Sequence, residues 1–193
     1  LTLSSDEETI ARTCGAIHIP VSELPCNAFT VSPTHPLRVS WSGGIRPLGD
    51  SGLQCFGRGE VAYRFSINEP IVAGSELHIA CELAAAVEEW EQTGVNSHPS
   101  RVTIAVNGQY SKEFGLPDAP ADYRGIVSHL CGLNGQYGYL VNLRVPVVET
   151  ILPTQGVEIV MAVDDFGSGA NGLTIFGVGC GRYGIDPIMK IVR

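Results

Sequence analysis

Residues 99–108 read PSRVTIAVNG, and this stretch indicates the fold class of the chain. Val102, Ile104 and Val106 alternate with small or polar residues, which is the period-two pattern of a half-buried strand. The stretch ends in Asn107-Gly108, a pair that suits the tight turn of a β-hairpin because both residues tolerate a positive φ. The sequence therefore predicts an antiparallel strand pair at this point.

Similar alternation recurs along most of the chain, and no segment sustains the period of about 3.6 residues that an amphipathic helix requires. The expected strands are 37–41, 60–67, 76–83, 102–106, 110–114, 139–145, 157–163, 173–176 and 188–192. This pattern predicts an all-β chain, an antiparallel β-sandwich of about nine strands. Residues 84–92 have helix-forming composition but fall between two strands, so we expect them to belong to a long loop on one rim. The other long connection is expected over 115–136.

The chain divides into two parts by composition. Residues 1–36 are punctuated by four prolines, which predicts an irregular N-terminal arm or linker. Residues 37–193 are expected to form a single β-sandwich domain, because sandwiches of this length usually fold as one unit. A hydrophobic fraction of 44% is enough for its core.

The charge of the chain limits its partners. A net charge of −8 repels phosphate backbones and anionic lipid headgroups, so neither nucleic acid nor a membrane surface is an expected partner. No run of about eighteen apolar residues is present that could cross a bilayer. The polar, acidic segment 1–8 does not have the pattern of a signal peptide. Neutral ligands, sugars above all, remain the favoured class.

The six cysteines leave the redox compartment open. No CxxC pair occurs, and their spacings match no zinc pattern. Cys14 with Cys26, or Cys131 with Cys180, could form disulfides, and the sequence does not decide between bridged and free thiols. Cys81 lies on the apolar face of an expected strand, where a free thiol packs as a small hydrophobe.

Four strings in the second half resemble a known module when they are taken in order: RVTIAVNG (101–108), DAPADYRGIVSH (118–129), QYGYLV (136–141) and GRYGIDP (181–187). The first resembles the hairpin of galactose-binding-like jelly rolls attached to carbohydrate-active enzymes. The series is similar to the carboxy-terminal β-sandwich of multidomain glycoside hydrolases of the family 2 type, over about residues 56–193. The resemblance implies a non-catalytic accessory domain of jelly-roll type, sugar-binding in some members and structural in others. It also implies a separate catalytic domain or chain, because family 2 enzymes carry their catalytic glutamates on a barrel of about 250 residues.

The first candidate for sugar binding is Trp90, which is flanked by Glu88, Glu89 and Glu91. An indole ring can stack on the apolar face of a pyranose while carboxylates accept hydrogen bonds from its hydroxyls. The alternative is a tryptophan that caps the rim of the core.

The second long loop supplies the other ligand candidates. Asp122 and Arg124 are best interpreted as a charge-assisted pair that pins the loop, although both groups could also bind sugar hydroxyls. Tyr123 and His129 could line the same rim. Asn134 and Tyr137 carry amide and phenol groups that suit hydroxyl recognition, but Asn134-Gly135 is also an ordinary turn signal.

A structural calcium ion is the one cofactor that the sequence suggests. Asp164, Asp165 and Asp186 could supply carboxylate oxygens in Gly-rich segments, with Glu60 as a further donor. No EF-hand spacing occurs, and a solvated turn is the simpler explanation.

These observations favour a carbohydrate-binding or accessory module of a glycan-degrading enzyme, acting outside the cell. No GxSxG, HExxH or P-loop motif is present, which favours a binding module over a complete enzyme. One alternative is a small jelly-roll lyase or hydrolase whose groove would hold Arg64, His78 and a tyrosine. The other is a structural or assembly subunit of jelly-roll type. The sugar, the disulfide pairing and the oligomeric state stay undetermined.

Overall fold

The structure is a computed structural model that describes residues 28–86, 100–116, 138–164, 172–181 and 183–193. These residues form strands and connections, with no helix among them. The strands are β1 (Ala28–Thr30), β2 (Arg38–Trp41), β3 (Ile45–Leu48), β4 (Gly52–Cys55), β5 (Gly59–Phe65), β6 (Glu76–Ala86), β7 (Ser100–Val106), β8 (Tyr110–Leu116), β9 (Tyr139–Pro146), β10 (Val157–Val163), β11 (Gly172–Ile175) and β12 (Ile188–Val192). No helix of the described ranges is long and apolar enough to cross a membrane.

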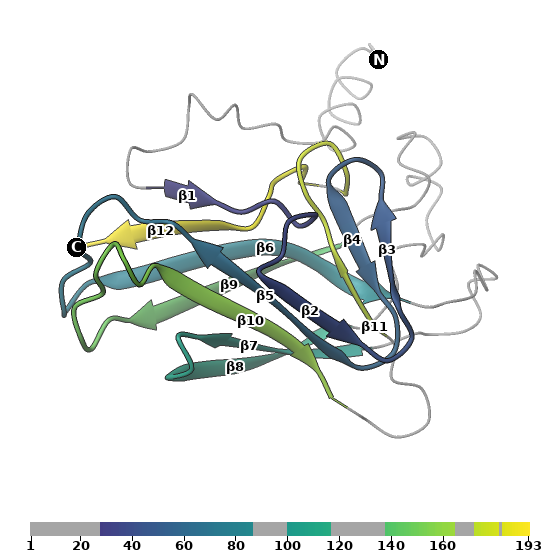
Figure 1. Ribbon diagram of the computed structural model, residues 1–193, viewed down its shortest axis with the longest axis horizontal. Helices are drawn as coiled ribbons and strands as arrows, with labels where there is room; N and C mark the ends of the chain where they lie inside the picture. Colours follow the sequence, from purple (N-terminus) through teal and green to yellow (C-terminus); the bar gives the residue numbers. More distant parts are fainter. Residues whose placement is uncertain (1–27, 87–99, 117–137, 165–171, 182) are drawn as a thin grey trace, which may run out of the picture.

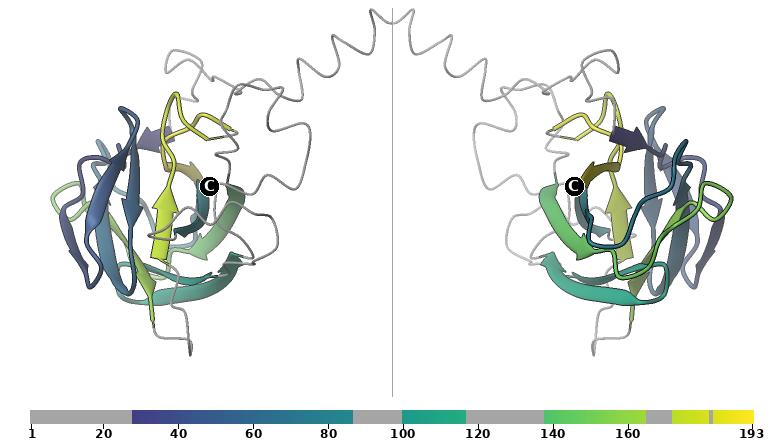
Figure 2. Two further views of the ribbon diagram at one scale, coloured as in Figure 1. Left: turned by 90° about the vertical axis from the view of Figure 1, so that its right-hand side faces the viewer. Right: turned by 90° about the vertical axis from the view of Figure 1, so that its left-hand side faces the viewer.

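The strands form two antiparallel sheets that curve around a shared interior (Figures 1 and 2). The five-stranded sheet has the order β2-β5-β10-β7-β8. The seven-stranded sheet has the order β1-β12-β6-β11-β4-β3, and β9 pairs with the other side of the long strand β6. The expected all-β, antiparallel β-sandwich is confirmed.

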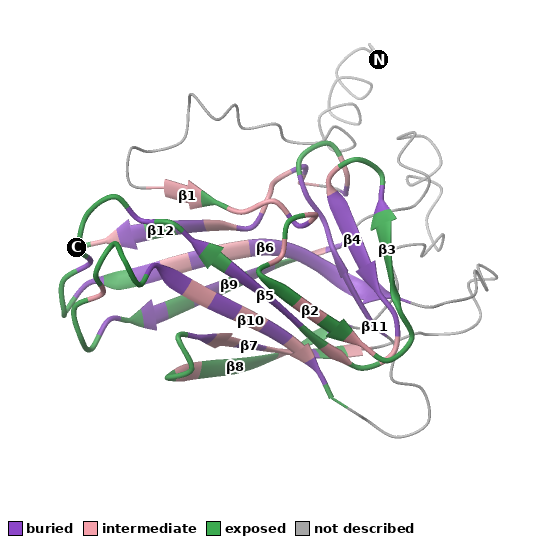
Figure 3. Cartoon of the chain, viewed as in Figure 1, coloured by how far each residue is buried: buried purple, intermediate pink, exposed green. Residues whose placement is uncertain are grey.

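The core lies between the two sheets, and the alternation along the strands builds it (Figure 3). Along β5, Val61, Tyr63 and Phe65 are fully buried, whereas Glu60 and Arg64 on the opposite face are exposed and only the small Ala62 of that face is buried. Each large apolar side chain buried in this way contributes about 1.5–3 kcal/mol. Cys81 of β6 faces the same interior as a free thiol, and burial raises its pKa to about 12, so it packs as a small apolar group.

The expected hairpin over β7 and β8 is confirmed in detail. Asn107 and Gly108 both have positive φ, 49° and 68°, as a type I′ turn requires. The Gln109 N–H donates to the Val106 carbonyl at 3.1 Å and closes the turn. β7 and β8 then pair from Val106–Tyr110 to Ser100–Leu116.

The structure adds three short strands to the expected set, β1, β3 and β4, and it corrects one boundary. The Ala84–Ala86 segment does not belong to a rim loop, because it continues β6 and pairs with β11. Its helix-forming composition is overridden by pairing with residues that are distant in sequence, and all three alanines are buried.

Candidate functional site

A cavity of about 470 Å³ opens at one end of the sandwich, among residues that all lie in the described part of the chain. The β7–β8 turn and the β9–β10 connection form its walls; both lie at the end shown on the left of Figure 1. Arg64 and Glu158 reach it from β5 and β10. Its volume falls within the range of about 300–1,000 Å³ that is typical of small-molecule sites.

The floor of the cavity is apolar and its rim is polar. Four buried side chains, at most 5% exposed, form the floor: Leu77, Val106, Val145 and Val147. Polar groups surround them, from Arg64, Asn107, Gln109, Glu149, Thr150 and Gln155. The half-buried Tyr110 adds an aromatic surface to the lining. An apolar floor with a few convergent polar groups is the usual composition of a ligand pocket.

Backbone hydrogen bonds hold the β9–β10 wall against the β5–β6 connection. Val147 N–H donates to the Ser75 carbonyl, and Gly74 N–H donates to the Val147 carbonyl, each at 2.8 Å. Ile71 and Ile151 exchange both of their backbone hydrogen bonds at 2.9 Å. The wall is therefore formed before any ligand arrives, which lowers the entropy cost of binding.

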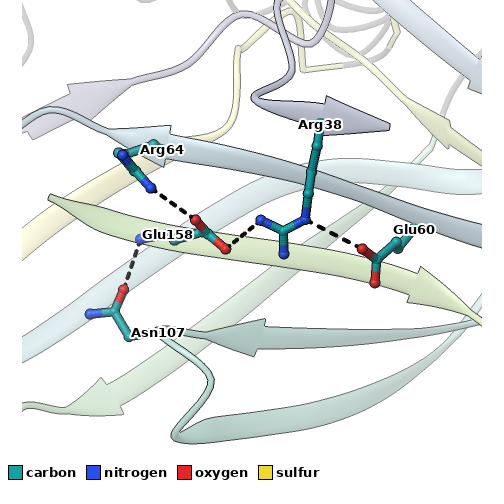
Figure 4. Close-up of polar contacts among 5 residues, drawn as sticks. All are labelled: Arg38, Glu60, Arg64, Asn107 and Glu158. Atoms are coloured by element: carbon teal, nitrogen blue, oxygen red, sulfur yellow. Dashed lines mark hydrogen bonds and ion pairs between the residues drawn. The ribbon is translucent and has the colours of Figure 1, made fainter. Parts of the chain in front are cut away.

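Asn107 fixes the opposite wall by pairing with the backbone of Glu158 (Figure 4). Its N–H donates to the Glu158 carbonyl at 2.9 Å, and its side-chain Oδ1 accepts the Glu158 N–H at 2.8 Å. The turn residue that allows the positive φ thus also attaches the hairpin to β10.

A network of ion pairs continues from Glu158 across the outer face of the five-stranded sheet (Figure 4). The two carboxylate oxygens of Glu158 accept from Arg38 Nη1 at 2.8 Å and from Arg64 Nη2 at 3.2 Å. Arg38 also approaches Glu60 at 3.4 Å. Hydrogen bonds from Arg38, with a smaller contribution from Arg64, lower the pKa of Glu158.

The lowered pKa of Glu158 predicts a specific pH dependence of stability. Because the folded-state pKa lies below the ordinary value of 4.5, the ionised carboxylate stabilises the fold above that value, and this contribution is lost as the pH falls through the folded-state pKa. We expect E158Q to be less stable than the wild type at neutral pH, with the difference shrinking below pH 4.5. Urea unfolding of the wild type and E158Q, from neutral pH to below pH 4.5, measures this difference in stability.

The matched control for this prediction is E113Q, because Glu113 pairs with Arg101 at 3.1 Å on the same sheet with both side chains 49% exposed. Solvent screening makes such a pair worth little, so E113Q should change stability by less than E158Q. A difference between wild type and E158Q that stays constant with pH would contradict the assignment.

All of the residues predicted to bind ligand lie outside the described ranges: Trp90, Asp122, Tyr123, Arg124, His129, Asn134 and Tyr137. The same holds for Asp165 and for Cys131, whereas Cys180, its candidate disulfide partner, is a free thiol. Their roles stay predictions.

Three of the carboxylates predicted to bind calcium are described. Glu60 lies on β5 and approaches Arg38 at 3.4 Å. Asp164 follows β10 and is exposed. Asp186 lies between β11 and β12, where its Oδ1 accepts the Val178 N–H at 3.0 Å and burial raises its pKa. Among the described residues, no group of three or more His, Cys, Asp or Glu side chains could hold a metal ion. Because Asp165 lies outside the described ranges, the calcium site stays a prediction.

Arg64 and His78, which the lyase alternative places in one groove, lie in different sheets. Arg64 belongs to β5 in the five-stranded sheet, and His78 belongs to β6 in the seven-stranded sheet, where it contacts Glu76 at 2.9 Å. Both point away from the core, so the sandwich separates them. The groove that the lyase alternative required is not formed by this pair.

The cavity residues were not predicted from the sequence as a site. The sequence indicates connections between strands at Asn107-Gly108 and at 149–155. This is the one signal that could have indicated the cavity residues. The pairing of β7 with β10 brings these two connections together, because it places Val106 opposite Ile159. That pairing joins residues about fifty positions apart, and no local pattern encodes it.

No protein-family model matches the sequence, and no curated protein matches it either. Among solved structures, the chain is similar to a CBM36 carbohydrate-binding module in complex with calcium and xylotriose, at 9% identity and a TM-score of 0.42, over 84% of this chain and 98% of that one. It is similar to a CBM35 module from Cellvibrio japonicus at 14% identity and a TM-score of 0.42, over 86% and 93%.

A third similar structure is a family GH115 4-O-methyl-α-glucuronidase, at 8% identity and a TM-score of 0.43. The match covers 92% of this chain and 19% of the enzyme, so the chain spans about a fifth of its length. Carbohydrate-binding modules and glycoside hydrolase domains are thus among the structures that the chain resembles. The TM-scores are low, and the fold assignment therefore rests on the sheet order and register of the chain itself.

Proposed function

We propose that this chain is a carbohydrate-binding module that holds one end of a glycan in the cavity beside the β7–β8 turn. The observation that carries the proposal is the composition of that cavity: an aromatic ring, an apolar floor and several amide, hydroxyl and guanidinium groups on preformed walls. Sugars are neutral and amphipathic, so their C–H faces stack on aromatic rings and their hydroxyls bind amides and hydroxyls. The net charge of −8 does not oppose such a ligand.

The finer part of the proposal concerns the setting in which the module works. We expect it to serve a glycan-degrading enzyme outside the cell, with catalysis on another domain or chain. The affinity should be modest, because sugar hydroxyls exchange good hydrogen bonds with water for similar ones with protein.

A glycan array with the full chain tests the proposal, run once with calcium and once with EDTA. We expect selective binding, and we expect Y110A to weaken it by about tenfold or more, since loss of a stacked ring costs about 1.4 kcal/mol. Q109A is the second variant, because Gln109 is exposed and its truncation leaves the core intact. S111A is the control, because Ser111 is exposed and does not line the cavity.

Three outcomes separate the possibilities. A blank array under both conditions would refute sugar binding. Binding that survives Y110A and Q109A but is lost in W90A would place the site on the predicted rim loop instead of the cavity. Binding lost only in EDTA would support the predicted calcium site.

A further inference from the structure

Four polar side chains on the cavity rim offer hydrogen-bond donors. The Oδ1 atom of Asn107 already accepts the Glu158 N–H at 2.8 Å, and the Oε1 atom of Gln155 accepts the Leu152 N–H at 2.9 Å. A backbone N–H can only donate, so these bonds fix both amide orientations. Figure 4 shows the Asn107 nitrogen pointing away from the Glu158 backbone. Each amide therefore keeps its NH₂ group for a ligand.

Two further side chains add donors to the same rim. Thr150 Oγ1 accepts the Ala73 N–H at 3.4 Å, which leaves its hydroxyl hydrogen available. Arg64 is held by Glu158 through Nη2, and its remaining N–H groups stay available because a guanidinium carries five donors. A rim of this kind suits a ligand with a strong acceptor, such as a carbonyl or a carboxylate.

The charges at the site distinguish between these two acceptors. Glu149 lines the cavity and makes no ion pair with any residue of the described ranges, and Glu158 adds a second carboxylate that its two arginines balance. A carboxylate ligand would lie near Glu149 on a protein of net charge −8. Like-charge juxtaposition of this kind is unfavourable, so a neutral carbonyl is preferred.

The floor adds a second requirement. Leu77, Val106, Val145 and Val147 offer no polar atom from their side chains, so a hydroxyl pushed against them would lose its hydrogen bonds. A methyl group would instead be stabilised by burial against them. The ligand must therefore present a methyl group and a carbonyl oxygen close together.

From this combination we infer that the cavity selects a sugar that carries an N-acetyl group, an N-acetylhexosamine at the end of a glycan. The acetyl methyl packs on the valine and leucine floor, and the acetyl carbonyl accepts from the amide rim. The N–H of the acetamido group donates to the carboxylate of Glu149. The inference rests on the proposed sugar-binding function and names its ligand class.

Calorimetric titration of the full chain tests this with N-acetylglucosamine and N-acetylgalactosamine against glucosamine, galactosamine, glucose, galactose and glucuronic acid. We expect the N-acetyl sugars to bind at least about tenfold more tightly than the others, which corresponds to about 1.4 kcal/mol. Two variants test the rim, N107D and Q155E. Each keeps the oxygen that accepts the backbone N–H and replaces only the donating NH₂ group, so the fold is retained.

Both variants should lose about tenfold or more in affinity for the N-acetyl sugars, because a carboxylate oxygen then faces the acetyl carbonyl. The control is N142D, which adds the same charge at an exposed position of β9 outside the cavity. N142D should bind as the wild type does.

The outcomes distinguish this inference from the proposed function. Equal or tighter binding of sugars without the acetyl group would overturn the inference and leave sugar binding in place. N-acetyl sugars that bind N107D and Q155E as well as the wild type would also overturn it, since the site would then lie elsewhere. If neither the titrations nor the array detect any sugar, the proposed function fails, and the inference fails with it.

Discussion

Replacing Glu82 by glutamine is expected to destabilise the protein by about 3 kcal/mol, or roughly 6–12 °C in Tm. Glu82 is fully buried, and its two carboxylate oxygens accept the Gly138 N–H at 2.7 Å and the Tyr183 N–H at 2.8 Å. A glutamine offers one oxygen for these two donors. Its NH₂ group would face the other backbone N–H, which leaves a buried donor without an acceptor.

The position of Glu82 in the seven-stranded sheet explains why its hydrogen bonds stabilise the fold. Its neighbours Cys81 and Leu83 face the core, so Glu82 faces the outside of the sheet. On the neighbouring side of β6, β11 ends where Ile175 pairs with Leu83, and β12 begins where Ile188 pairs with Ala80. The segment between β11 and β12 therefore leaves and rejoins the sheet beside Glu82. The Glu82 carboxylate holds this segment by accepting the Tyr183 N–H.

The same strand supplies the matched control. Glu76 of β6 has a half-exposed side chain and contacts His78 at 2.9 Å, so E76Q should change the free energy of unfolding by less than about 1 kcal/mol. Urea unfolding of the wild type, E82Q and E76Q measures both effects. Equal stabilities for E82Q and E76Q would show that the hydrogen bonds of Glu82 add nothing to the fold.

Sequence patterns were sufficient to predict a strand wherever apolar and polar residues alternate over five residues or more. β5, β9, β10 and the 76–83 part of β6 were predicted in position and in the face they bury, because alternating burial is a local property that period two encodes. The β7–β8 turn was predicted for the same reason, since Asn-Gly favours the required backbone directly.

The strands that the patterns missed are short and depend on their neighbours. β1 has three residues and pairs with β12, and β3 includes Pro47, a residue that argues against a strand. β4 has only four residues, and its polar Gln54 is buried like the others, so the sequence pattern is too short to indicate a strand. The burial of Glu82 could not be predicted either. An alternating strand places a glutamate on its polar face whether solvent or another segment covers that face.

Replacing Gly172 by alanine is expected to cost about 3 kcal/mol or more. A Cβ on Gly172 would lie 1.7 Å from the Cys55 carbonyl oxygen and 2.7 Å from the Cys55 carbonyl carbon. Both are backbone atoms of β4, which pairs with β11 from Leu173–Cys55 onward. A flexible side chain could move aside, but here the two strands themselves must separate, and strain of this kind in a close-packed interior typically costs 1–3 kcal/mol and occasionally more.

Gly115 provides the comparison, because it also lies in a strand, and a Cβ there would meet nothing within 4 Å. G115A should leave the free energy of unfolding unchanged or raise it slightly, since alanine restricts the unfolded chain more than glycine does. Denaturant unfolding of both variants separates steric overlap from the general effect of losing a glycine. If G172A and G115A unfold at the same midpoint, the close approach of β4 and β11 is not a feature of the folded protein. A selective loss in G172A would show that this approach is part of the fold and that β4, which the patterns missed, is held where the structure places it.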